Sequence, residues 1–139
     1  MQKVLLPLLL ALLLGVNPAW AAEDEEGEEV VAKTSSYVSL GPPMVLNLSN
    51  DSRRLTFLQL QADIVIEDSN SEMLIKPHVP AIRHQLIVLL SEQKVSDMKS
   101  SAKREEIRKI ATTQVQELIT GLTGSEDVGD VLFSSFLVQ

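Results

Sequence analysis

The chain has 139 residues, a formal net charge of −7 and no cysteine. That length allows one domain of ordinary size, and a negative charge with few aromatic residues argues against general nucleic-acid binding, because a phosphate backbone is neutralised by a dense lysine and arginine face. The lack of cysteine excludes disulfides, thiolate nucleophiles, iron–sulfur clusters and the usual structural zinc sites.

The first 21 residues have the layout of a secretory signal peptide. Lys3 precedes an apolar run of 13 residues (4–16), and Ala19 and Ala21 flank Trp20 before the expected cleavage point. A helix that crosses the hydrocarbon core needs roughly 20 apolar residues. We therefore expect residues 1–21 to be removed and the protein to reach the bacterial periplasm. Anchoring in the inner membrane through an uncleaved segment is the alternative.

Residues 22–36 predict an acidic, disordered linker. Six acidic residues lie between positions 23 and 29, and few side chains there could be buried. Like charges repel one another, and no apolar face offsets the entropy of ordering. The acidity of the protein belongs mainly to this segment, because residues 34–139 carry ten basic and 13 acidic residues.

Two strands are expected at the start of the folded part. Residues 37–48 form an entry segment and then a short strand near residues 44–48, separated by Gly41-Pro42-Pro43, because prolines lack the donors of a central strand. In residues 55–67 apolar side chains occupy alternate positions with Gln59, Gln61 and Asp63 between them, which predicts a long strand with one buried face. The expected inward side chains are Leu58, Leu60, Ala62, Ile64 and Ile66.

A first amphipathic helix is predicted after the turn residues 68–71, most securely over residues 80–92. Its apolar stripe recurs at spacings of three and four and consists of Ile75, Val79, Ile82, Leu86 and Leu89. Pro77 and Pro80 predict a kinked start or two short pieces. Residues 96–101 are polar and predict a hinge.

A second helix is predicted over residues 102–122. Its expected inner face consists of Ile107, Ile110, Ala111, Val115, Leu118 and Leu122. Glu105 precedes Lys109 by four residues, a spacing that favours an ion pair on an exposed helix surface. Gly121 and Gly124 are stop signals. The branched and aromatic residues 128–139 predict a closing strand that docks in the sheet.

The order strand, strand, helix, helix, strand shows no repeat at solenoid spacing. It predicts an α+β domain over residues 37–139, in which a small antiparallel or mixed sheet of about three strands carries both helices on one face. This arrangement buries both helical stripes economically.

No residue of this sequence is predicted to be catalytic, to bind a cofactor or to ligate a metal. His78 and His84 are six residues apart, not at the four-residue spacing that places two ligands on one helix face. We expect His78, between two prolines, and His84, on the flank of the first helix, to be surface residues. Ser134 and Ser135 have no base nearby in sequence. A hydrolase site assembled from distant residues is the weak alternative.

Three groups of residues are candidates for contact with partners. The one basic region lies at the start of the second helix and consists of Lys99, Lys103, Arg104, Arg108 and Lys109. It is either a solvated face interleaved with acids or a contact for an acidic partner or lipid headgroups. Gln59, Gln61 and Asp63 face solvent or another subunit. Met73, Leu74 and Phe136 belong to the core or to an association surface.

Several short motifs follow one another along residues 37–139. They are Tyr37-x-x-Leu40 with Pro42, Val45, Asn47 and Leu48, then Pro80-x-Ile82-Arg83 with Ile87 and Leu89-Leu90-Ser91, and finally Val131-Leu132-Phe133 and Phe136-Leu137-Val138-Gln139. Their order, around the long alternating strand, resembles the FliL family of flagellar basal-body-associated proteins.

The resemblance implies a periplasmic domain similar to the stomatin-type SPFH fold, without catalysis or cofactor. It further implies a homo-oligomer, in ring form, that contacts flagellar stator or basal-body proteins and supports swimming or swarming. Family members typically begin with a transmembrane helix, whereas this chain begins with a signal-like segment, so the inner membrane is involved by proximity or through an uncleaved signal. The alternative is a soluble periplasmic binding or scaffold module unrelated to motility.

Overall fold

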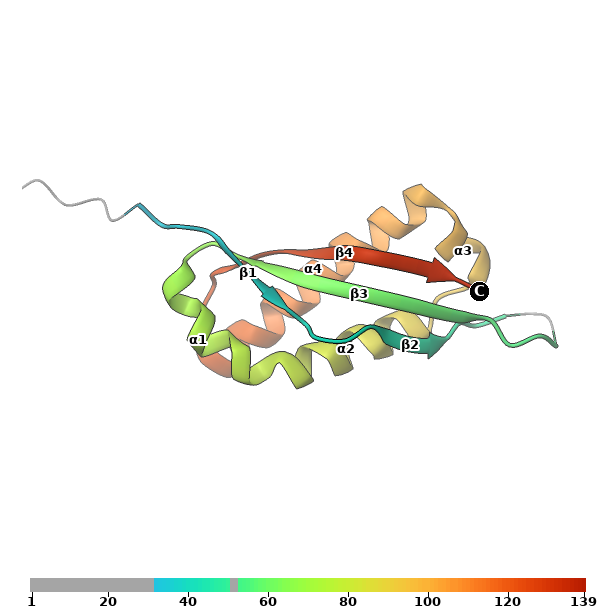
Figure 1. Ribbon diagram of the computed structural model, residues 1–139, viewed down its shortest axis with the longest axis horizontal. Coiled ribbons are helices and arrows are strands. Elements are labelled where there is room, and N and C mark those ends of the chain that lie inside the picture. The colour runs from blue at the N-terminus through green and yellow to red at the C-terminus, as the bar shows by residue number, and fades with distance from the viewer. Residues whose placement is uncertain (1–31, 51–52) are drawn as a thin grey trace, which may run out of the picture. The chain divides into compact units, whose positions relative to one another are not determined.

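The computed structural model describes residues 32–50 and 53–139. The predicted signal peptide and all of the acidic residues of the predicted linker lie outside these described residues. The described part forms an α+β domain with one open antiparallel sheet of four strands and helices packed against it (Figure 1). The predicted fold class is confirmed.

The central strand of the sheet is β3 (Phe57–Ile66), which pairs with β1 and β2 on one side and with β4 on the other. Its alternation places every second side chain in the core, as predicted. These inward residues, Leu58, Leu60, Ala62, Ile64 and Ile66, are completely buried.

The sheet has four strands where about three were predicted, because the expected entry segment is itself a strand. β1 (Ser36–Ser39) pairs with the second half of β3, and β2 (Met44–Asn47) pairs with its first half. A ten-residue strand is long enough to hold two short partners end to end. Gly41 turns the chain between them with a φ of +87°, a conformation that favours glycine.

Arg83 fixes this turn from the helical layer. Its Nη1 donates to the carbonyl oxygens of Leu40 and Pro42, at 2.7 Å each. These two carbonyl oxygens lie between β1 and β2, where the edge of the sheet is interrupted. Arg83 therefore provides hydrogen bonds to acceptors that no neighbouring strand would bind.

The closing strand β4 (Val128–Val138) pairs with nearly the whole length of β3. Two register shifts give β4 an extra residue near Ser134 and another at Gly129. Beyond the strand, Gln139 and Phe57 exchange backbone hydrogen bonds of 3.0 and 2.7 Å. The prediction of a docked closing strand is confirmed.

The first helical region is broken, as the prolines predict. α1 (Glu72–Ile75) follows a 3-10 turn (Ser69–Ser71), and a second 3-10 turn (Lys76–His78) separates it from α2 (Val79–Ser91). The predicted stripe is buried at Ile75, Ile82, Leu86 and Leu89, with Val79 partly buried beside it.

The predicted hinge at residues 96–101 is instead mostly a short helix, α3 (Val95–Lys99). Met98 is completely buried and holds α3 against the core. The segment before it is tied to the sheet, because Ser49 N donates to Gln93 O and Val95 N donates to Ser49 O. Apolar burial at one position therefore outweighs the polar sequence around it.

The long helix α4 (Ser101–Thr123) follows its N-cap Ser100, whose hydroxyl accepts from Lys103 N. It passes through Gly121 and is terminated by its C-cap Gly124, which adopts the left-handed conformation. Its inner face is rotated from the predicted one. The buried residues are Ile107, Ala111, Thr112, Val115 and Ile119, whereas the expected Ile110 and Leu122 are exposed and Leu118 is partly buried. The rotation brings polar side chains of α4 to β4.

The helices cover one face of the sheet and leave the other open. Figure 1 shows the four strands in front and α2 and α4 behind them. The core between the layers is built from the inward residues of β3 and the inner faces of α2 and α4. Within the described residues, no helix is long and apolar enough to span a bilayer.

Truncation of a central core side chain tests this two-layer arrangement. Ile64 is completely buried and faces the helices, whereas its neighbour Val65 faces the open side. We expect Ile64→Ala to lower the free energy of unfolding by about 3 kcal/mol, through lost burial and a residual cavity. Val65→Ala should cost about 1 kcal/mol or less. Urea unfolding measures both values, and equal costs would contradict the one-sided core.

Candidate interaction surface

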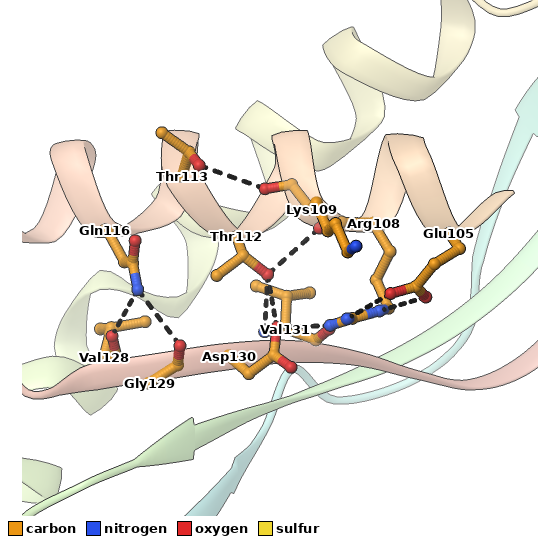
Figure 2. A network of polar contacts seen from close by, with 10 residues as sticks. All are labelled: Glu105, Arg108, Lys109, Thr112, Thr113, Gln116, Val128, Gly129, Asp130 and Val131. Atoms are coloured by element: carbon orange, nitrogen blue, oxygen red, sulfur yellow. Dashed lines mark hydrogen bonds and ion pairs between the residues drawn. The ribbon is translucent and has the colours of Figure 1, made fainter. Parts of the chain in front are cut away.

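Side chains of α4 bind the free edge of β4 near its start (Figure 2). Gln116 Nε2 donates to the carbonyl oxygens of Val128 at 2.9 Å and Gly129 at 3.1 Å. Among the described residues β4 pairs with β3 alone, so these carbonyls lie where a further strand would otherwise add. The helix therefore seals the first part of this edge.

Arg108 binds the next part of the same edge of β4. Its Nη1 donates to Val131 O at 2.9 Å and pairs with the carboxylate of Asp130, while Nε and Nη2 each bind Glu105 at 2.8 Å. The bond to Glu105, and then the bond to Asp130, raise the pKa of Arg108 despite its partial burial. One guanidinium thus joins α4 to both the backbone and a side chain of β4, using the donor fork that arginine provides.

Thr112 lies at the centre of the network and is buried although polar. Its hydroxyl lies 2.7 Å from Asp130 Oδ1 and accepts from Val131 N at 3.1 Å. Burial raises the pKa of Asp130, but the hydrogen bonds from Thr112, Arg108 and Val131 N outweigh burial and lower it. Asp130 is therefore held as a carboxylate.

The extra residue Gly129 turns Asp130 towards α4. Val65 pairs with Asp130 and Ile66 pairs with Val128, so Gly129 forms a bulge between them. A Cβ at position 129 would lie 3.1 Å from Cγ of Glu67, which is tighter than ordinary contacts. Bulges redirect the side chains beside them, and here the redirected carboxylate meets Arg108 and Thr112.

The basic region predicted at the start of α4 is partly neutralised within the domain. The expected pair of Glu105 with Lys109 is wrong, because Glu105 binds Arg108. Lys103 pairs with Glu106 at 2.8 Å, and this bond raises the pKa of Lys103. The solvated interpretation therefore holds for Lys103, while Arg108 is engaged with β4.

Arg104 has a different environment, in a groove between the start of α4 and β4. Its guanidinium carbon lies 5.3 Å from the centre of the Phe136 ring, and the rings of Phe133 and Phe136 are 5.8 Å apart. The groove measures about 430 Å³ and is also lined by Ser101, Glu105, Arg108 and Leu132. Phe136, expected in the core or at a surface, is half-buried and contributes to both.

The open face of the sheet carries a second group of exposed side chains. Val45 and Leu137 flank Gln59 on neighbouring strands, and both are largely exposed. Tyr37 lies further along the same face, with 67% of its surface exposed. Gln59, predicted on this face with Gln61 and Asp63, is half-buried like them. Aliphatic and aromatic side chains thus alternate with polar ones across an uncovered sheet.

The remaining sequence candidates are dispersed. His84 is exposed on α2, His78 is half-buried in the 3-10 turn before it, and Met73 is 85% exposed on α1 beside Leu74. Ser134 and Ser135 are exposed on β4. In residues 32–50 and 53–139, no three His, Asp or Glu side chains gather as ligands of a metal ion would.

The sequence interpretation missed Thr112, Gln116 and Asp130. A signal was available, because Arg108, Thr112 and Gln116 recur every four residues and therefore form a polar stripe on one helix face. The partner of this stripe could not be read from the sequence, since it depends on a bulge in β4.

The fold and its surfaces define a small α+β domain in which Arg108 and Asp130 join a helix to a strand and in which one face of the sheet is open. The family described as flagellar basal body-associated protein FliL matches residues 37–139. The chain therefore belongs to the FliL family. No curated protein matches the chain.

Removal of one hydroxyl tests the seal between α4 and β4. Thr112→Val keeps the shape of the side chain but removes one of the two bonds of Val131 N and one of the bonds of Asp130, which keeps Arg108. We therefore expect a loss of about 1–2 kcal/mol in unfolding free energy. Thr113→Val is the matched control, because Thr113 Oγ1 donates to Lys109 O on the exposed side of α4 and makes no contact with β4 in the described part of the chain (Figure 2). The control should cost about 0.5 kcal/mol or less. Equal effects would contradict the seal.

Acid should weaken the same contact. Hydrogen bonds lower the folded-state pKa of Asp130 below the unfolded value of about 3.9. Its contribution is present above that unfolded value and is lost as pH falls through the lower folded value, because the unfolded chain then binds more protons. Asp130→Asn should cost about 1 kcal/mol at neutral pH, since the carboxylate is 39% exposed and partly screened.

Thermal unfolding between about pH 2 and pH 7 measures this dependence. Below about pH 4, the thermal unfolding midpoint of the Asp130→Asn variant should fall less steeply with decreasing pH than the midpoint of the unchanged protein. If the unfolding midpoints of the two proteins fell equally with pH below about pH 4, Asp130 would not be held as an ionised partner.

Proposed function

We propose that this protein is a non-enzymatic accessory of the flagellar motor that supports or modulates stator units through protein contacts in the periplasm. The observation that carries the proposal is the family match, which extends over residues 37–139 and thus over all four strands but one residue of β1. Membership of this family implies that the protein acts at the flagellar basal body. The periplasm follows from the signal-like residues 1–21.

The hydrogen bonds and cations around several described carboxylates support a role without proton transfer. Where the pKa of a described carboxylate is shifted, it is lowered, as at Glu72, Glu105, Asp127 and Asp130. Each of these groups is held ionised by hydrogen bonds or cations of its own domain. General acid–base catalysis instead favours groups whose pKa lies near the working pH.

The open face of the sheet is the surface that we assign to the stator contact. Val45, Leu137 and Tyr37 are exposed there beside the polar row of β3. Exposed apolar groups set among polar ones are typical of non-obligate interfaces. The proposal includes an assembly of several copies around each stator unit, in ring form, as the family resemblance implies.

A complementation experiment tests this proposal. Deletion of the gene should reduce swimming or swarming and the occupancy of fluorescent stator units at the motor. The unchanged gene should restore both, whereas Val45→Arg combined with Leu137→Arg should not, because buried unpaired cations disfavour the contact. Val88→Arg, on the exposed side of α2, is the control and should restore both.

Unchanged motility and stator occupancy after deletion would contradict the proposal. Crosslinking that recovers envelope proteins but never stator or basal-body components would then favour a periplasmic scaffold unrelated to motility.

A further inference from the structure

The edge of β4 is sealed over only part of its length. Gln116, Thr112 and Arg108 bind backbone groups of residues 128–131. Further along, Phe57 and Gln139 exchange both backbone hydrogen bonds. Because bonded pairs alternate along an antiparallel ladder, Phe136 and Val138 direct their N–H and C=O groups away from β3. No described residue hydrogen-bonds to these outward groups.

This open part of the edge lies beside the groove at the start of α4. Phe133 and Phe136 provide an aromatic floor, and Arg104 stands over Phe136. The structure gives Arg104 no carboxylate partner among the described residues. An extended segment that added to this edge would bind through its backbone, place apolar side chains in the groove and meet a cation.

The chain itself contains a segment of complementary chemistry. Residues 23–29 hold six acidic residues, and Val30 and Val31 follow them directly. Eight extended residues, 24–31, span about 27 Å. The open part of the edge, residues 133–138, needs about 20 Å. Acids can pair with Arg104 while the valines contact the aromatic floor.

The connection of this segment to the domain favours binding between copies. Residues 32–35 lead into β1, which pairs with residues 63–66 of β3 at the same end of the sheet as the start of β4. The groove is lined by Phe133 and Phe136, which pair with Ala62 and Leu60 of β3, nearer the other end of the sheet. A segment bound to its own domain would have to reverse along most of the sheet, whereas a segment from a neighbouring copy would not.

We propose that residues 24–31 of one copy add as a strand to residues 133–138 of β4 in a second copy, with their acids on Arg104. This contact is heterologous, since it joins different surfaces, and repeats of it generate a ring when the rotation closes. The inference deepens the self-association named in the proposed function and rests on it.

Sedimentation equilibrium of the purified protein tests the contact directly. The unchanged chain should associate with increasing concentration, and high salt should weaken the association. Replacing all six acids by their amides should leave a monomer. A monomer for the unchanged chain at about 100 μM, or undiminished association of the amide variant, would overturn the proposal.

A labelled peptide of residues 22–33 provides the second measurement. It should bind the amide variant saturably, and Arg104→Glu should weaken this binding about tenfold. Lys109→Glu is the matched control, an exposed cation of α4 outside the groove, and should weaken binding less than about threefold. Equal losses for the two variants would overturn the assignment of the groove.

Val138→Pro tests the backbone component, because it removes an N–H that faces the open edge and not the ladder. It should weaken peptide binding while thermal unfolding confirms a folded protein, and unchanged binding would overturn strand addition. A monomeric protein that still restores motility would reject this contact and leave the motor function standing.

Discussion

The attachment of α4 to the edge of β4 is the contact on which the arrangement of this domain depends. A four-stranded sheet with helices on one face has an exposed edge at β4, and a bare edge invites pairing with other chains. Arg108, Thr112 and Gln116 close the first part of that edge from the helix. The same bonds fix the rotation of α4 and hence the residues that it buries.

This contact also shows how the charged groups between α4 and β4 are used within the domain. Arg108 is bound by Glu105, Asp130 and a backbone carbonyl, and each partner favours the ionised form of the group it binds. Buried or half-buried ions need such partners, because desolvation otherwise disfavours them. Arg108 and Asp130 therefore hold a helix and a strand together, while apolar groups on the open face of the sheet stay exposed.

Because the chain belongs to the FliL family, these surfaces belong to a protein associated with the flagellar basal body. The two proposed contacts use surfaces that differ in position, so that self-association and partner binding would not compete. The open sheet face and the unsealed part of β4 are separate surfaces of one strand layer. Assembly through the edge would leave the face free for the motor.

The sequence by itself determined the elements whose pattern has a clear period: the alternation of β3, the stripe of α2, the proline break before it and the closing strand. It also carried the order of motifs typical of the family. Tertiary structure decided the strand identity of residues 36–39, the burial of Met98 and the rotation of α4. The reason is physical, since each depends on a partner distant in the chain: β3 for the first, the core for the second, and the Gly129 bulge with Asp130 for the third.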